Sequence, residues 1–230
     1  DQKIPTDTIK LWIKAQEKIN QDKKLKFFKT HNTFGKLNNF DFTNKENSIS
    51  CVYVVRDPRN VITSLKNFYE LKDDQAFKWI TNKNQYIYDV HKFEKDGFSD
   101  FQFISSWDTN FESWKTQKKI AIKIIRYEDL LNETYAVLND VISFIHQITN
   151  NKEKIYKNKI KNAVISSSFS KLKDKEEKEG FSEAPQSKSG DSKIPFFNLG
   201  PKNNWKIILN DDLKEKLNKV FKKQLEELSY

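Results

Sequence analysis

Tyr53-Val54-Val55-Arg56-Asp57-Pro58-Arg59-Asn60-Val61-Ile62-Thr63-Ser64 is the stretch that decides the fold, because it joins an apolar run to the start of a helix. Residues 49–55 are mostly β-branched and uncharged, which indicates a strand buried on both faces. Asn60 is a residue type that caps helices, and the apolar positions after it recur at helical spacing. The stretch therefore predicts a strand, a turn and a helix in succession.

Arg56 and Ser64 give this turn the chemistry of an anion-binding site. A guanidinium supplies a fork of donors, a serine hydroxyl supplies one more, and a helix N-terminus offers free N–H groups and a positive dipole. A capped helix with a surface arginine has the same pattern. On these residues alone both interpretations stay open.

Similar patterns elsewhere predict strands at residues 25–30 and 120–125. Helices are expected at residues 6–20, after residue 60, and at 76–90, 108–116, 133–145 and 211–228. Residues 171–193 are mostly charged or small and predict a mobile surface loop. Strands that alternate with helices indicate a single α/β domain over residues 1–230, with three layers and a mostly parallel sheet.

The composition favours an anionic partner without identifying it. The chain has 230 residues, 41 Lys+Arg against 32 Asp+Glu, a net charge of +9 and a sequence pI near 9.3. Lysine-rich surfaces also arise from genomic base composition. The positive charge can therefore reflect base composition and not the choice of a ligand. Cys51 is the one cysteine, which indicates a reduced core thiol. Without a membrane span or a signal-peptide pattern, we expect a cytoplasmic protein.

Four segments, taken in order, resemble the motifs of the cytosolic-type sulfotransferase family. They are Lys29-Thr30-His31, Arg56 to Ser64, Arg126-Tyr127-Glu128-Asp129-Leu130, and Phe196 to Trp205. The resemblance runs from about Leu25 to the C-terminus and implies a P-loop nucleotide-transferase-like fold. It also implies 3'-phosphoadenosine 5'-phosphosulfate as the sulfuryl donor and adenosine 3',5'-bisphosphate as the product.

The same resemblance assigns the donor contacts. Arg56 and Ser64 would hold the 3'-phosphate, and Tyr127 would contact the adenine. Ser167 and Phe169 match the Ser-Phe pair of the family on the adenine side. Core packing is the competing interpretation for Tyr127 and Phe169.

The late loop, Phe196 to Trp205, departs from the family pattern. Asn198 and Leu199 stand where many members carry arginine and lysine, whereas Gly200 matches the family glycine. Two expected phosphate contacts are therefore missing, and Lys202 would supply charge from a shifted position. We include Asn198, Gly200 and Lys202 among the expected donor-binding residues.

His31 is the expected general base, because an imidazole titrates near neutrality and can take the proton of an acceptor hydroxyl or amine. Lys29 lies two residues earlier, on the same side of the expected strand, and would stabilise the transferring sulfuryl oxygens. A polar histidine at a strand end and a surface lysine are the ordinary alternatives. No Cys/His/carboxylate spacing indicates a metal site, so we expect no metal requirement.

The family's first strand and its glycine-containing phosphate loop find no match in this chain, because residues 1–24 contain no glycine. We expect that segment to lie upstream in a longer protein. Without it, the chain would bind the 3'-phosphate and adenine but transfer sulfate slowly or not at all. The prediction is that the sheet lacks this strand.

Two other function classes compete with a sulfotransferase. A phosphonucleotide-binding or scaffold protein of the same fold would also lack the late-loop cations. A P-loop kinase relative fits less well, because the Arg56–Ser64 spacing suits a 3'-phosphate better than a metal-bridged triphosphate. No helix carries a basic face beside stacking aromatics, so we expect no nucleic-acid partner. The acceptor is expected to be a small molecule or glycan-like group.

Overall fold

The structure is a computed structural model of the chain and describes residues 6–88 and 101–230. Its contacts divide the chain into two compact units. The first unit comprises Asp1–Tyr53 and Trp79–Lys123, and the second comprises Val54–Lys78 and Ile124–Tyr230. The end of the predicted helix at residues 89–90, and His91 after it, lie outside the described residues.

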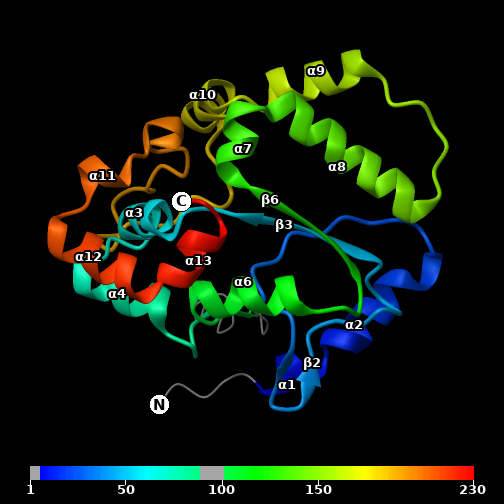
Figure 1. The fold of residues 1–230 in the computed structure, drawn as a ribbon, viewed down its shortest axis with the longest axis horizontal. Coiled ribbons are helices and arrows are strands. Elements are labelled where there is room, and N and C mark those ends of the chain that lie inside the picture. The colour runs from blue at the N-terminus through cyan, green and yellow to red at the C-terminus, as the bar shows by residue number, and fades with distance from the viewer. Residues whose placement is uncertain (1–5, 89–100) are drawn as a thin grey trace. The chain divides into compact units, whose positions relative to one another are not determined.

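The parallel sheet is built from β3 (Ser50–Val55) and β6 (Ala121–Arg126), which lie side by side (Figure 1). Each strand leads into a helix, α3 (Pro58–Phe68) after β3 and α7 (Tyr127–Asn132) after β6. The strand, turn and helix predicted around Tyr53 to Ser64 are confirmed. The strand predicted at residues 120–125 is confirmed as β6, but α7, which follows it directly, was not predicted. The α/β class with a parallel sheet flanked by helices is also confirmed.

Two details of this sheet differ from the predictions. Val55 is only 2% exposed but Val54 is 50% exposed, so β3 is not buried on both faces. Successive strand residues point to opposite faces, and one face of β3 is covered far less than the other. Residues 25–30 form no strand, because Phe27 and Phe28 are 72% and 70% exposed and their apolar surface joins no core.

The first unit contains short helices and two antiparallel strand pairs. Its helical elements are α1 (Thr6–Lys10), α2 (Trp12–Ile19), η1 (Asn20–Asp22) and α6 (Trp107–Thr116). Its strand pairs are β1 (Lys36–Leu37) with β2 (Phe40–Asp41), and β4 (Tyr86–Ile87) with β5 (Gln102–Phe103). Helix α4 (Asp73–Thr81) runs from the second unit into the first and ends at Thr81, where sequence patterning extended it to residue 90.

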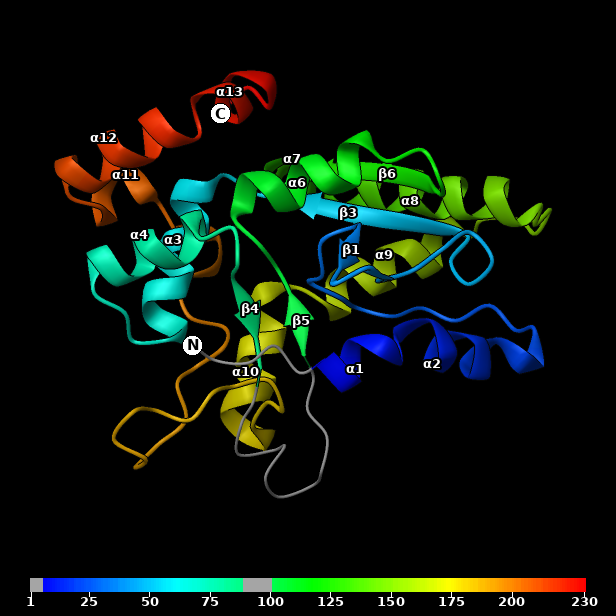
Figure 2. The same cartoon turned by 90° about the horizontal axis from the view of Figure 1, so that it is seen from below.

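The second unit is mostly helical. Besides α3 and α7 it contains α8 (Thr134–Thr149), α9 (Lys157–Ser166), α10 (Phe169–Glu179), η2 (Gly200–Lys202), α11 (Trp205–Ile208), α12 (Asp211–Val220) and α13 (Lys222–Glu227). Figures 1 and 2 show α11 and α12 beside α3. Ile62 of α3 and Leu217 of α12 are fully buried.

Two predictions for the second unit are wrong, one for the loop at residues 171–193 and one for the C-terminal helix. The loop predicted at residues 171–193 is helical up to Glu179, because lysine and glutamate are good helix formers and pair one turn apart, as Lys175 does with Glu179. The predicted helix at residues 211–228 is divided at Phe221, whose side chain is fully buried. Within the described ranges, no helix has the length and apolar character needed to cross a bilayer.

Candidate donor and catalytic sites

Arg56 follows the last residue of β3, and one nitrogen of its guanidinium lacks a hydrogen-bond partner. Its Cζ atom lies 4.2 Å from the centre of the Tyr127 ring, and its Nε atom is buried without a hydrogen-bond partner. Arg56 forms no ion pair with any residue that the structure describes. A buried donor without a partner costs free energy, so this side chain is suited to an anion that would satisfy it.

The backbone N–H groups at the N-terminus of α3 are already hydrogen-bonded within the protein. The expectation that they would bind an anion is therefore wrong. Asp57, not Asn60, caps the helix, and its Oδ1 atom accepts a hydrogen bond from the Arg59 backbone N–H at 2.8 Å. The next two backbone N–H groups, of Asn60 and Val61, bond to the Asp57 carbonyl. The helix end therefore has no spare N–H groups, and an anion here would depend on side chains.

Ser64 places an exposed hydroxyl on the second turn of α3. Its Oγ atom lies 3.4 Å from the Asn60 carbonyl, which is a long hydrogen bond, and it accepts one from Asn203 Nδ2 at 3.3 Å. Ser64 and Arg56 thus belong to the same unit, at the end of β3 and on the helix that follows it.

The adenine-side residues lie on three segments of the same unit. Tyr127 begins α7 and packs against Arg56, as described above. Ser167 ends α9, and its hydroxyl donates to the Ala163 carbonyl at 2.8 Å, so its proton serves the helix end. Phe169 begins α10 and packs edge to face against Phe197 at 6.1 Å between ring centres.

Gly200 fits closely against the Phe169 ring. Its φ angle is +52°, which favours glycine, and a Cβ atom at this position would lie only 2.3 Å from an atom of the ring. The predicted Gly200 and Phe169 positions are therefore in direct contact. Any base that stacks on Phe169 must use ring surface that Gly200 leaves open.

Asn198 and Lys202 are exposed on the same late loop. Lys202 lies in η2 and forms no ion pair with a described residue, so its charge is available to a ligand. Asn198 forms no hydrogen bond with its side chain to any residue that the structure describes. The eight predicted donor residues all belong to the second unit.

The two predicted catalytic residues belong to the first unit. His31 is exposed, in an irregular segment, and its backbone is held on both sides. Its N–H donates to Gln102 Oε1 at 2.6 Å, and its carbonyl accepts from Asn110 Nδ2 at 3.0 Å. Asn110 is itself buried, and its Oδ1 atom accepts from the Tyr53 hydroxyl at 2.9 Å. The main chain at His31 is therefore fixed without a strand.

Lys29 is exposed in the same irregular segment. The argument that placed Lys29 and His31 on one side of a strand is wrong, because residues 25–30 form no strand. Outside a strand, the two-residue spacing of Lys29 and His31 does not imply that their side chains point to the same side.

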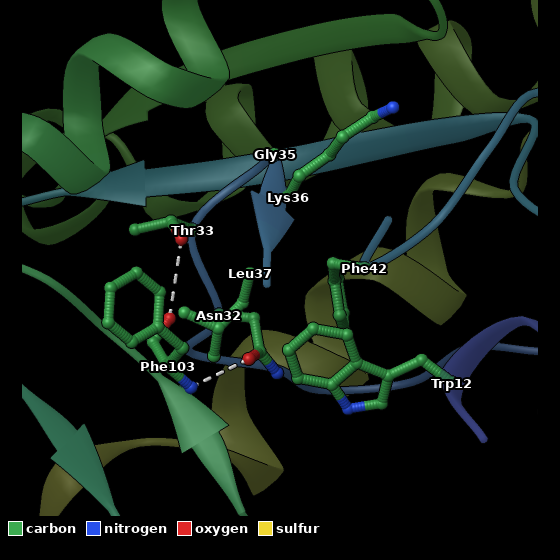
Figure 3. A pocket seen from close by; sticks show the side chains of 8 residues that line it. All are labelled: Trp12, Asn32, Thr33, Gly35, Lys36, Leu37, Phe42 and Phe103. Atoms are coloured by element: carbon green, nitrogen blue, oxygen red, sulfur yellow. Dashed lines mark hydrogen bonds between the residues drawn. The ribbon is translucent and has the colours of Figure 1, made fainter. Parts of the chain in front are cut away.

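A small cavity is lined in part by Asn32, the residue that follows His31 in the sequence. It has a volume of only about 10 Å³ and is lined by residues of the first unit that include Trp12, Phe42 and Phe103 (Figure 3). Asn32 Oδ1 accepts from the Phe103 backbone N–H at 2.8 Å, which seals one side. Pockets for drug-sized ligands are about 300–1,000 Å³. This cavity is therefore too small to hold a whole acceptor.

Sequence reasoning missed four residues that organise these sites. Gln102 and Asn110 hold His31, while Arg59 and Asn203 fasten the late loop to α3. Asn110 had a weak signal, because it lies in the helix predicted at residues 108–116. The others form contacts that no local pattern reports. Groups of three or more His, Cys, Asp or Glu able to hold a metal do not occur in the described ranges.

Comparison with known proteins adds three findings. The family described as "Sulfotransferase domain" matches residues 8–229. A flavonol 3-sulfotransferase of Flaveria bidentis is 24% identical over 230 residues, covering 96% of this chain and 69% of that protein. The crystal structure of mouse sulfotransferase SULT7A1 complexed with PAP aligns with a TM-score of 0.52 and 15% identity.

The structural match covers 79% of this chain but only 60% of the mouse chain, so this chain spans well under the full length of that relative. At 15% identity the match supports the fold and nothing further. The family match extends over almost the whole chain. This chain belongs to the sulfotransferase family.

Proposed function

We propose that the protein transfers a sulfuryl group from 3'-phosphoadenosine 5'-phosphosulfate to the hydroxyl or amine of a small-molecule or glycan-like acceptor. The observation that carries the proposal is the guanidinium of Arg56, which is partly buried, lies on the Tyr127 ring and forms no ion pair with a described residue. Family membership supports sulfuryl transfer as the reaction class.

The donor would be held by side chains of the second unit. Arg56 would form charge-assisted hydrogen bonds to the 3'-phosphate, and the exposed Ser64 hydroxyl would donate one more. Lys202 would add a positive charge from the late loop. Tyr127 and Phe169 would pack on the adenine, with Ser167 beside it.

His31 would act as the general base. When bound, the donor supplies an activated sulfuryl group. The acceptor oxygen or nitrogen attacks its sulfur, the bond from sulfur to the 5'-phosphate oxygen breaks, and adenosine 3',5'-bisphosphate leaves. His31 takes the proton that the acceptor loses, and Lys29 stabilises negative charge on the sulfuryl oxygens. Under this proposal the reaction requires no metal and takes place in the cytoplasm, without a nucleic-acid partner.

A second candidate function is phosphonucleotide binding without transfer. Asn198 and Leu199 favour it, because uncharged side chains replace two cations that many family members use on the donor phosphates. A binder of this kind would keep the Arg56 site and lack turnover.

A transfer assay with sulfur-35-labelled donor separates the two functions. The full-length protein is incubated with phenols, alcohols, amines and sugars, and the labelled product is counted. His31→Ala should lower the rate at least about 100-fold, the usual contribution of a general base. His146→Ala, in α8, is the matched control and should leave the rate unchanged. An unaltered rate in His31→Ala would refute the base assignment, and tight nucleotide binding without transfer would favour the binder.

A further inference from the structure

Asn203 is a buried polar residue on the late loop, at the base of α3. It is 9% exposed, and its side chain contacts three polar groups of α3. Nδ2 donates to the Asn60 carbonyl at 3.0 Å and to Ser64 Oγ at 3.3 Å. Oδ1 accepts from the Thr63 hydroxyl at 2.6 Å.

The orientation of this amide follows from its partners. The Asn60 carbonyl can only accept, so the nitrogen of Asn203 must face it, and the oxygen then faces the Thr63 hydroxyl. No flipped orientation satisfies both contacts. The nitrogen that faces the helix is also the one that reaches Ser64.

Asn203 also decides what the Ser64 hydroxyl can do. A carbonyl oxygen has two lone pairs. Within α3 the Asn60 carbonyl accepts the Ser64 backbone N–H, and Asn203 Nδ2 donates to the same oxygen at 3.0 Å. The contact from Ser64 to the same carbonyl is long, at 3.4 Å. Because Asn203 donates to the serine oxygen and competes for the carbonyl, the Ser64 proton is left for an outside acceptor.

We propose that Asn203 is a positioning residue that orients the Ser64 hydroxyl toward the donor's 3'-phosphate and so determines selectivity for 3'-phosphorylated nucleotides. This inference rests on the proposed function. Asn203 does not touch the nucleotide in this scheme and acts through Ser64. The late loop thereby contributes to phosphate recognition although it has no cation at Asn198 or Leu199.

Two further contacts hold the late loop to α3 independently of Asn203. The Trp205 backbone N–H donates to Asn60 Oδ1 at 3.0 Å, and the Arg59 guanidinium lies 3.9 Å from the centre of the Trp205 ring. These contacts do not involve Asn203. The loop should therefore stay fastened to α3 when the Asn203 side chain is shortened.

The test compares two nucleotides that differ only in the 3'-phosphate. Calorimetry measures the Kd of adenosine 3',5'-bisphosphate and of adenosine 5'-monophosphate for wild type, Asn203→Ala, Ser64→Ala and the double variant. Asn203→Ala should weaken bisphosphate binding about tenfold, the value of one hydrogen bond to a charged group, and leave monophosphate binding unchanged. The double variant should be no weaker than Ser64→Ala.

Asn204→Ala is the matched control, because this neighbouring asparagine is exposed and its side chain caps α11 through the Lys206 N–H. It should leave both Kd values unchanged. Asn203→Asp keeps the shape of the side chain and loses the donor, so it serves if the alanine variant melts early by circular dichroism.

Three results would overturn the proposal. They are an unchanged bisphosphate Kd in Asn203→Ala and Asn203→Asp, equal weakening of both nucleotides, and additive losses in the double variant. If the wild type does not prefer the bisphosphate, the donor site of the proposed function fails as well. If the wild type prefers it and the variants do so equally, only the role of Asn203 fails.

Discussion

Replacing Arg59 with alanine removes a cation that is almost completely buried. Arg59 and Asp57 are 7% and 4% exposed. The guanidinium Nε lies 2.9 and 3.1 Å from the two Asp57 carboxylate oxygens, and Nη2 lies 2.8 Å from one of them. Nη1 donates to Asn218 of α12 at 2.9 Å, and the Trp205 ring packs on the guanidinium. One side chain thus connects α3 with the late loop and α12.

The expected loss follows from the charge that the substitution leaves behind. Removing one partner of a buried ion pair costs about 3–5 kcal/mol, because the remaining charge is desolvated and unpaired. In Arg59→Ala, Asp57 becomes that unpaired charge. In Asp57→Asn/Arg59→Ala no buried charge remains, and asparagine can still cap α3. We therefore expect the double variant to be more stable than Arg59→Ala.

Urea unfolding followed by circular dichroism measures the free energy of unfolding of each variant. Lys222→Ala is the control, because its pair with Glu226 is exposed on both sides and should contribute less than about 0.5 kcal/mol. A loss below about 1 kcal/mol in Arg59→Ala would refute the reasoning. A double variant that is less stable than Arg59→Ala would refute it as well.

Three further predictions concern other parts of the molecule. Gly200→Ala should lower the melting temperature and weaken nucleotide binding, whereas Gly180→Ala, also at positive φ but with no atom within 4 Å of a Cβ, should show only the backbone penalty of about 1–2 kcal/mol. Asn110→Ala should lower kcat about tenfold and alter its pH profile while the donor Kd stays constant, because the substitution frees the main chain of His31. Burial raises the pKa of the Cys51 thiol from 9.0 to about 11, so alkylation by iodoacetamide at pH 8 should be slow until the protein unfolds. The same shift makes the unfolded chain lose its thiol proton first, so the free energy of unfolding should fall between about pH 9 and 11, and less so in Cys51→Ala.

Much of the fold could be predicted because its signals are local. The apolar runs that became β3 and β6 are bounded by charged residues, and the patterns of α3 and α8 repeat every turn. Residues 25–30 carry the same kind of signal but remain exposed, since an apolar run does not report whether anything packs on it. The helix α10 was missed because its residues are charged, although lysine and glutamate favour helices.

The sequence offers candidate site residues, which stay predictions, but it does not report the contacts that these residues make. The order of motifs pointed to Arg56 and Tyr127, and their ring contact shows that the two belong together. The hydrogen bond from Thr63 to Asn203 joins residues 140 positions apart, and no local pattern encodes it. The capping of α3 by Asp57 instead of Asn60 did have a local signal that sequence reasoning did not use, because aspartate caps helices and Pro58 suits the first helical position.

The most direct measurement of the central claim is calorimetric titration of adenosine 3',5'-bisphosphate into wild type, Arg56→Ala and Arg126→Ala. Arg126 is the matched control, since it also ends a strand, has a buried Nε without a partner and packs on a tyrosine ring, that of Tyr230. Loss of a buried charge-assisted contact should weaken binding by about 2–5 kcal/mol, or about 30-fold to 5,000-fold. The account predicts this loss in Arg56→Ala and near wild-type binding in Arg126→Ala. Equal binding by wild type and Arg56→Ala would contradict it.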